Sequence, residues 1–198
     1  MNPLYEMDAE IRAQHGIFCG VDEAGRGPLC GPVSVAACIL NPDDPIEGLN
    51  DSKKLSEKKR EALYEQIVSR ALAWKVILVG PEIIDRDNIL QATMGGMRQA
   101  VEELDITPNY VVVDGNRCPT GLSMPCEAMV KGDARSASIA AASILAKVSR
   151  DRYMEEMALK YPEYEFERHK GYPTKRHYEL LRKYGPCEIH RRTFLKKL

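Results

Sequence analysis

The 198-residue chain contains no segment of the kind that crosses a membrane or directs export. No apolar run approaches the roughly 20 residues that a spanning helix needs. Residues 1–15 are polar and mixed in charge, unlike the basic and then apolar start of a signal peptide. Internal repeats, low-complexity tracts and an obvious linker are also missing. These absences predict one globular protein with a single substantial core and no membrane partner.

Cysteine patterns typical of disulfide frameworks or zinc sites are missing too. The six cysteines form no C-x-x-C pair and no zinc-like cluster with histidine. Three of the six lie in apolar, strand-like segments, where a free thiol behaves as a small hydrophobe. We therefore expect reduced thiols and a cytoplasmic location.

The sequence has no G-x-x-x-x-G-K-[ST] loop and no dinucleotide-binding fingerprint. Its glycine-rich turn, Gly25-Arg26-Gly27, has the spacing G-x-G-x-x-x-G, is followed by Pro28 and leads into a strand-like segment. The turn fits either a phosphate-binding loop, in which glycines let backbone N–H groups approach an anion, or a plain hairpin connection. A nucleotide-cofactor enzyme of Rossmann type is disfavoured.

Positive charge is scarce in the first two thirds of the chain. Residues 1–130 hold 12 Lys and Arg against 20 Asp and Glu, whereas residues 131–198 hold 16 against 9. Three of the four histidines also lie in the second part. A basic C-terminal third beside acidic strand ends favours a polyanion partner, although charged surfaces are usually just solvated.

The order of apolar and capped segments predicts an α/β layered domain with a mixed sheet. The expected strands cover parts of residues 16–23, 32–40, 74–80, 110–116 and 126–130. The expected helices follow Ser56, Pro81, Asp133 and Thr174. Sites in such sheets gather at the strand ends.

Four carboxylates stand at these predicted strand ends: Asp22, Glu23, Asp114 and Asp133. Burying such a group is costly unless a cation compensates its charge. Oxygen ligands without a nearby cysteine or histidine suit Mg²⁺ or Mn²⁺, and a pair of such ions serves phosphoryl chemistry. Each acid alone has an ordinary explanation as a turn or helix-start residue. The four together, with glycines beside each, favour a metal centre.

Three basic segments are candidates for contact with a polyanion. Lys53 and Lys54 either bind phosphates or are simply solvated, and residues 190–192 are either a phosphate contact or a charged tail. Residues 168–177 place one aromatic ring, Tyr172, in a basic loop shaped by glycine and proline. That arrangement suits a ring that meets a sugar or base, and a buried structural tyrosine is the alternative.

Taken together, these segments resemble bacterial ribonuclease HII, the type 2 ribonuclease H. They occur in the family's order from residue 17 to about residue 194, and only their combination is specific. The matching segments are GVDEAGRGP at 20–28, NDSKKLS at 50–56, VDGN at 113–116, KGD at 131–133, AASILAKV at 141–148 and HKGYPTK at 169–175.

The resemblance implies an RNase H-like fold, with a mixed five-stranded sheet flanked by helices and a helical C-terminal extension. We expect a catalytic domain at residues 1–165 and a basic extension at 166–198 packed on it. The implied activity is hydrolysis of the RNA strand of RNA/DNA hybrids and nicking 5′ of single ribonucleotides in duplex DNA. Such cleavage leaves 3′-OH and 5′-phosphate ends and serves ribonucleotide removal and primer degradation.

The family's motifs also imply roles for individual residues. Two Mn²⁺ or Mg²⁺ ions would be held by the catalytic acids, Asp22, Glu23, Asp114 and Asp133. The ribonucleotide's 2′-OH would be sensed through the minor groove by Gly25, Arg26 and Gly27, together with Tyr172 at the junction. The remaining substrate-binding candidates are Lys53, Lys54 and Lys147.

Two other interpretations fit less well. Ribonuclease HIII has a different residue in place of Arg26 and carries an extra N-terminal substrate-binding domain. A non-catalytic nucleic-acid-binding module on the same fold is the alternative; it would explain the basic C-terminal third but not the four carboxylates. We expect a monomer, and residues 194–198 contain no clear sliding-clamp peptide.

Overall fold

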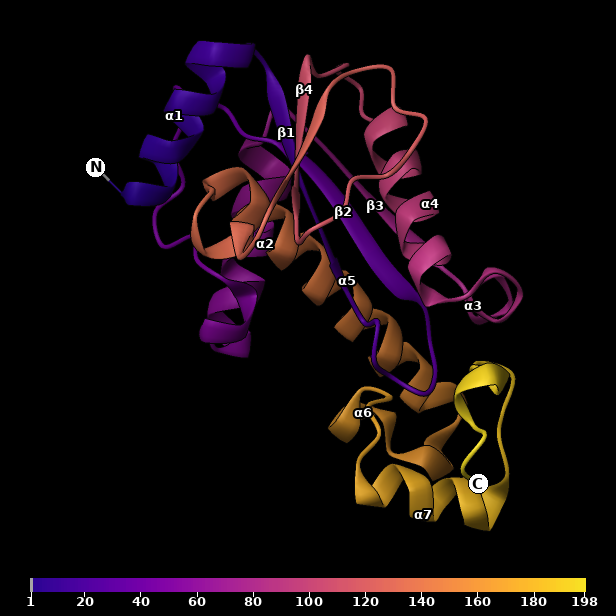
Figure 1. The fold of residues 1–198 in the computed structure, drawn as a ribbon. Coiled ribbons are helices and arrows are strands. Elements are labelled where there is room, and N and C mark those ends of the chain that lie inside the picture. Colours follow the sequence, from indigo (N-terminus) through magenta and orange to yellow (C-terminus); the bar gives the residue numbers. More distant parts are fainter. Residues whose placement is uncertain (1) are drawn as a thin grey trace.

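The apolar strand segments pair into one sheet in the computed structural model, which describes residues 2–198. The strands are β1 (Phe18–Ala24), β2 (Val33–Ile39), β3 (Ala73–Val79), β4 (Tyr110–Asp114) and β5 (Cys126–Met129). β1 pairs antiparallel with β2 and parallel with β4, and the sheet order is β3-β2-β1-β4-β5 (Figure 1). The prediction of a mixed five-stranded sheet is confirmed.

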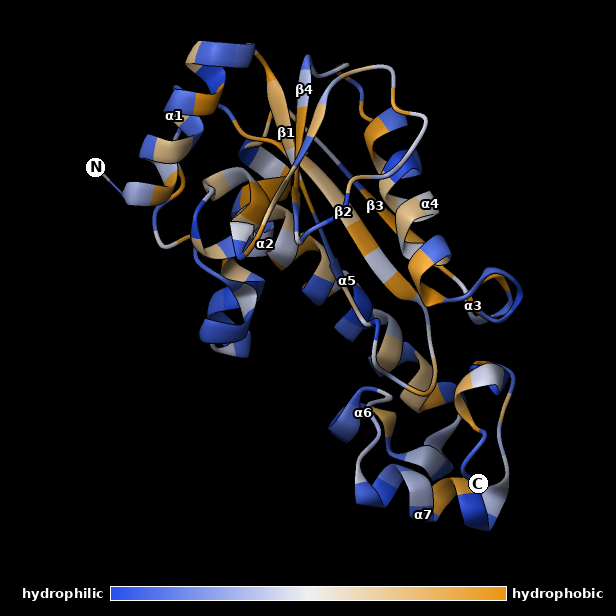
Figure 2. Cartoon of the chain, in the orientation of Figure 1, coloured by the Kyte–Doolittle hydropathy of each residue, from blue (hydrophilic) through white to orange (hydrophobic). Residues whose placement is uncertain are grey.

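Helices cover both faces of the sheet. They are α1 (Pro3–His15), α2 (Glu57–Arg70), α3 (Pro81–Asp87), α4 (Ile89–Glu102), α5 (Ala137–Lys160), α6 (Phe166–His169) and α7 (Lys175–Tyr184). Short 3₁₀ turns lie at η1 (Ser52–Lys54), η2 (Gly132–Ala134), η3 (Pro162–Tyr164) and η4 (Arg192–Phe194). The strands and inner helix faces are the apolar part of the ribbon, while α7 is largely hydrophilic (Figure 2). In residues 2–198 we find no helix that has both the length and the apolar character to span a bilayer.

Small residues let the long helix α5 lie close against the sheet. Its first turns are rich in alanine and serine, and residues 140–142 are fully buried against β2 and α2. The closest approach is at Gly20 of β1, where a Cβ atom would overlap the backbone of Ser138 and Ile139. On the opposite face, α4 packs against the sheet through a second core cluster that includes Met97 and Val101. These two contacts fix the position of β1, the strand that carries Asp22 and Glu23.

Gly20→Ala is therefore expected to destabilise the protein by about 1–3 kcal/mol, because the added methyl group can be accommodated only by moving α5 away from β1. Gly95→Ala is the matched control. Gly95 lies in the middle of α4 with nothing within 4 Å of a Cβ, so the same change there should stabilise by about 0.5–1 kcal/mol. Urea unfolding midpoints measure both, and equal midpoints for the two variants would contradict the packing argument.

Two helical segments differ from the sequence-based expectation. The polar N-terminal segment forms α1, which is held by Asp8: this fully buried carboxylate accepts hydrogen bonds from Ser136 Oγ (2.6 Å), Ser138 N (2.9 Å) and Ser138 Oγ (2.7 Å). The helical region predicted from Pro81 divides at Asn88, whose φ of 73° ends α3 and whose side chain caps α4. The predicted caps at Ser56 and Thr174 are confirmed.

The C-terminal segment packs at the far end of α5 (Figure 1). Its core contains Leu180 and Leu181 of α7 with Phe166, and these side chains pack with Met154 of α5 and Leu29 of the loop after β1. Backbone hydrogen bonds join the same loop to the chain's end, since Gly31 N donates to Ile189 O and Leu29 O accepts from Arg191 N, both at 2.8 Å. The loop that follows β1 is thereby enclosed by the C-terminal segment.

Candidate active site

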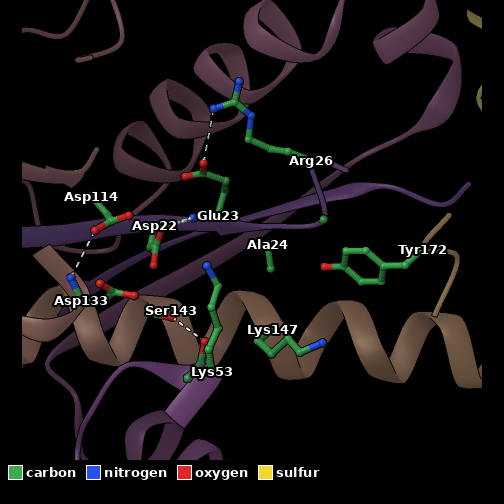
Figure 3. A pocket seen from close by; sticks show the side chains of 12 residues that line it. Asp22, Glu23, Ala24, Arg26, Lys53, Asp114, Asp133, Ser143, Lys147 and Tyr172 are labelled. Atoms are coloured by element: carbon green, nitrogen blue, oxygen red, sulfur yellow. Dashed lines mark hydrogen bonds and ion pairs between the residues drawn. The ribbon is translucent and has the colours of Figure 1, made fainter. Parts of the chain in front are cut away.

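The strand pairing brings three of the predicted acids to one end of the sheet. Parallel strands β1 and β4 pair Val21 with Val113, so the next residues, Asp22 and Asp114, are neighbours. Asp133 enters from η2, and its backbone N–H donates to Asp114 Oδ1 at 3.2 Å. The three carboxyl groups lie near one another, with the side chain of Lys53 reaching toward them (Figure 3).

Glu23 points to the other face of β1, because successive side chains of a strand alternate. Its N–H donates to Asp22 Oδ1 at 2.8 Å, and its Oε1 lies 3.7 Å from Arg26 Nη1. Its other oxygen, Oε2, is buried and has no hydrogen-bond partner in the described residues. A buried carboxylate oxygen without a donor is costly, so Glu23 Oε2 is a candidate acceptor for a donor group or a cation.

One cleft collects most of the residues that the sequence predicts. Those that line it are Asp22, Glu23, Gly25, Arg26, Lys53, Asp114, Asp133, Lys147 and Tyr172. Gly27 and Lys54 do not line the cleft; both are exposed nearby. Lys54 lies on η1 beside Lys53, which does reach the acids.

Burial and mutual repulsion raise the pKa values of these acids. For Asp22, which is 5% exposed, desolvation is the main cause, and the charges of Asp114 and Glu23 add to it. The pKa of Glu23 is raised by desolvation, with Arg26 acting in the opposite direction. Desolvation, then Asp114, raises the pKa of Asp133 to about 6. Carboxyl groups placed so close to one another ionise favourably only if a cation lies among them.

The arrangement fits a divalent metal centre. The donors are carboxylate oxygens, the ligands that Mg²⁺ and Mn²⁺ prefer, and Glu23 Oε2 is unsatisfied without one. Among the described residues 2–198, no three of these four acids bring their carboxylate oxygens within 4.8 Å of one another. They surround the cleft and leave room between them, which suits ions that bind one or two carboxylates together with substrate phosphates.

The glycine turn after β1 uses its two glycines differently. Gly25 has a φ of 91°, and a Cβ there would collide with Arg150, so the chain itself requires glycine at this position. Gly27 does not have a positive φ, and no atom lies within 4 Å of the position that a Cβ atom would take there. Its exposed face is open to an approaching molecule, which supports the binding-loop interpretation of the turn over a plain hairpin connection.

Tyr172 lies at the opposite end of the cleft from the acids (Figure 3). It is 37% exposed, so it is not a buried structural tyrosine. Two cations flank its ring, with Lys147 Nζ 6.0 Å and Arg150 Cζ 5.6 Å from the ring centroid. Lys147 is also paired with Asp151 at 2.9 Å. The ring thus stands at the edge of the cleft in a positive surrounding.

Three residues of the cleft region were missed in the sequence. Ser52 and Ser143 line it and are joined by a 2.7 Å hydrogen bond, which ties η1 to α5. Asp51 lies close enough to Asp133 to raise its pKa, and it caps η1 by accepting from Lys53 N at 2.9 Å. The signal was present, because Asp51 and Ser52 belong to the NDSKKLS segment and Ser143 to the AASILAKV segment, and both segments carry part of the family resemblance.

The fold brings one cysteine beside two histidines, although the sequence shows no zinc-like spacing of these residue types. Ligand atoms of Cys30, His177 and His190 lie within 4.8 Å of one another and are buried. The hydrogen bonds identify a neutral chain and not a metal site. Cys187 N donates to His190 Nδ1 at 2.9 Å, and His177 Nδ1 donates to Tyr172 O at 3.0 Å, so His190 Nε2 donates to His177 Nε2 at 3.0 Å.

A metal ion on His190 Nε2 would place a proton on Nδ1, facing the N–H of Cys187, and two donors would then oppose each other. Burial also lowers the pKa values of both imidazoles, to about 4 for His177 and about 3 for His190, which keeps them uncharged. The cluster therefore fixes the loop that carries Tyr172.

Comparison with known proteins gives consistent matches over nearly the whole chain. The family model described as Ribonuclease HII matches residues 19–197. A protein named Ribonuclease HII from Dechloromonas aromatica (strain RCB) is 59% identical over 185 residues, covering 93% of this chain and 94% of that protein. One of the same name from Caldicellulosiruptor bescii is 56% identical over 181 residues, covering 91% of this chain and 87% of that protein.

Solved structures agree with the fold. Ribonuclease H2 from Pyrococcus horikoshii OT3 matches with a TM-score of 0.74 and 32% identity, covering 89% of this chain and 92% of that one. RNase HII from Archaeoglobus fulgidus, solved in complex with PCNA, matches with a TM-score of 0.75 and 27% identity, covering 88% and 93%. Bst-RNase HIII with Mn²⁺ matches with a TM-score of 0.67 and 16% identity, covering 85% and 63%, a likeness of fold alone. The RNase H-like fold is thus confirmed.

Proposed function

The chain belongs to the ribonuclease HII family of metal-dependent endoribonucleases that act on RNA/DNA hybrids, and we propose that Asp22, Glu23, Asp114 and Asp133 form its catalytic metal centre. The observation that carries the proposal is the meeting of four carboxylates from β1, β4 and η2 in one cleft, with an unsatisfied buried oxygen on Glu23. The non-catalytic binding module gives no reason for this costly arrangement.

When bound, divalent ions supply an activated water and stabilise the charge that develops on the leaving 3′ oxygen. Asp22 on one face of β1 and Glu23 on the other, together with Asp114 and Asp133, would hold such ions in the cleft. Lys53 and Arg26 lie beside these acids and balance part of their charge, because each lowers the pKa of an acid that it faces. The same two cations are placed to receive the phosphates of the strand that is cut.

The ribonucleotide is identified at the other end of the cleft. We propose that the backbone of Gly25–Gly27 reads the 2′-OH, the group that distinguishes RNA from DNA, while Tyr172 packs against the neighbouring sugar. The open face at Gly27 and the exposed ring of Tyr172 support this assignment. Cleavage then falls 5′ of the ribonucleotide, both in long hybrids and at a single ribonucleotide in duplex DNA.

A nicking assay tests this function. A labelled DNA duplex with one ribonucleotide is incubated with the protein in Mg²⁺, Mn²⁺ or EDTA, with an all-DNA duplex as control. We expect a metal-dependent nick immediately 5′ of the ribonucleotide and none in the control. Binding without a nick in either metal would instead support the binding module.

The metal centre should also appear in thermal stability. Mn²⁺ or Mg²⁺ at about 100 times its dissociation constant adds roughly 2.7 kcal/mol to the free energy of unfolding, which is roughly 5–10 °C in Tm for a chain of this size. NaCl at equal ionic strength controls for screening. A full shift retained in Asp114→Asn would place the bound ion elsewhere. When the two ions are compared at one equal concentration, the larger shift identifies the ion that binds more tightly.

We further propose a cytoplasmic monomer whose residues 166–198 complete the substrate-binding surface of a catalytic domain at 1–165. The packing of the C-terminal segment on α5 and on the loop after β1 supports that division of labour.

The Archaeoglobus relative was solved with PCNA, but here Phe194 packs against the hydrophobic clusters beside α3 and α7. Its aromatic ring is therefore engaged within the protein, which supports the prediction of no clamp peptide in residues 194–198.

A further inference from the structure

Two buried arginines lie behind the glycine turn. Arg150 of α5 is 1% exposed and Arg191 near the C-terminus is 0% exposed. Both guanidinium groups donate only to backbone carbonyl oxygens, and within residues 2–198 neither has a carboxylate within salt-bridge distance. Burying a charge without a counter-ion is costly, so these side chains need an explanation beyond general packing.

The guanidinium group of Arg191 hydrogen-bonds to the glycine turn itself. Its Nη2 donates to Gly25 O at 2.6 Å, and its Nη1 donates to Arg26 O at 3.0 Å and to Pro28 O at 2.9 Å. Its Nε donates to Gly31 O at 2.9 Å, which closes the loop on the same side chain. Five N–H groups in a planar fork can hold several carbonyls at once, which a lysine cannot do.

These hydrogen bonds to the carbonyls also fix the direction in which the N–H group of each peptide points. The described peptides are all trans, and in a planar trans peptide the C=O and the following N–H point in opposite directions. Because Arg191 draws the carbonyls of Gly25 and Arg26 inward, the N–H groups of Arg26 and Gly27 point outward, away from the protein. Within residues 2–198 these two N–H groups have no backbone partner.

We propose that Arg191 is a positioning residue for ribonucleotide selectivity: it holds the turn so that the N–H groups of Arg26 and Gly27 face the substrate as paired donors. The inference rests on the proposed function, and it deepens the role of the turn. An acceptor such as the ribose 2′ oxygen fits two fixed donors, and a deoxyribose offers nothing in its place. Four carbonyl dipoles compensate the charge of Arg191. Burial and then the charge of Arg150 lower the pKa of Arg191 to about 9, which still leaves the guanidinium protonated at neutral pH.

The test measures selectivity as a ratio of affinities. All proteins carry Asp133→Asn to prevent cleavage, and the dissociation constants for an all-DNA duplex and for the same duplex with one ribonucleotide are determined by fluorescence anisotropy in Mg²⁺. Selectivity is the dissociation constant for the all-DNA duplex divided by that for the ribonucleotide duplex. We expect Arg191→Lys to lower this ratio about tenfold, since a single amine cannot hold the carbonyls of both peptides. A merely structural role would lower the folded fraction and weaken both affinities alike, leaving the ratio unchanged.

Two control variants separate positioning from charge and from stability. Arg192→Lys changes the exposed neighbour of Arg191 and should leave the ratio within twofold of the parent protein. Leu181→Ala removes a buried side chain of the same C-terminal core without touching the turn, and it too should keep the ratio. An equal fall of the ratio in Leu181→Ala would overturn the proposal, because general loosening would then explain it.

An unchanged ratio in Arg191→Lys would also overturn the proposal. If that variant does not fold, Arg191→Gln retains amide donors without a buried charge and is expected to show the same loss of selectivity. Failure of both to fold would count against the proposal and assign Arg191 to structure. The proposed function fails separately, if the parent protein, with Asp133 intact, binds the ribonucleotide duplex but does not nick it in Mg²⁺ or in Mn²⁺.

Discussion

Asp133→Asn is expected to reduce the rate of nicking by roughly 10³-fold or more, equivalent to about 4 kcal/mol of transition-state stabilisation. The variant should still fold and bind duplex. Asparagine has nearly the shape of aspartate, and the N–H of residue 133 can still donate to Asp114 Oδ1. What is lost is one negative charge of the proposed metal centre. Single-turnover nicking in Mn²⁺ measures the rate, and anisotropy measures the affinity for the uncut duplex.

Asp51→Asn is the matched control for this experiment. Asp51 lies next to Asp133 and influences its pKa, but its carboxylate caps η1 by accepting from Lys53 N. Asparagine is as good a cap, so this variant should keep the nicking rate within about tenfold of the parent. If Asp133→Asn falls no further than Asp51→Asn, then residue 133 does not hold a catalytic ion and the centre is formed by the other three acids.

The acidic end of the cleft was predictable because the information that specifies it is local in the sequence. Asp22 and Asp114 each follow a short apolar strand, and parallel pairing of those strands is enough to make them neighbours. Asp133 follows the next strand and a glycine. The opposite faces on which Asp22 and Glu23 lie also follow from alternation along β1. A residue's sequence context therefore predicts its place at a strand end well.

The supporting residues were not predictable in the same way. Arg191 bonds to carbonyls 160 to 166 positions away, and a backbone carbonyl has no signature in the sequence. The chain of Cys187, His190 and His177 is likewise assembled by the fold, since only the stacked arrangement of the C-terminal segment shows which imidazole faces which. The same holds for Asp8, whose partners lie 128 and 130 residues away in α5. Sequence motifs thus predicted most of the residues that line the cleft, and the structure identified residues that hold the neighbouring loops in place.

The second large effect concerns stability. Asp22→Asn should abolish activity, yet in EDTA at pH 7 it should stabilise the protein by about 1–3 kcal/mol, the order of the desolvation penalty of a buried polar group. In the parent, desolvation and then Asp114 and Glu23 disfavour the ionised form of Asp22, so its pKa is raised in the folded state. The asparagine carries no charge to be repelled.

The pH dependence of this effect has a definite sign. A carboxyl whose pKa is higher in the folded than in the unfolded state binds more protons when folded, so stability falls as the pH rises through that interval. In EDTA the parent should therefore lose stability as the pH rises above the ordinary aspartate value of about 4, and Asp22→Asn should lose less. Urea midpoints across pH 4–8 measure this, with Mn²⁺ expected to restore the parent but not the variant. A parent whose stability in EDTA rises with pH would show that Asp22 is already compensated by the protein, and the cleft would then need no metal to hold its acids together.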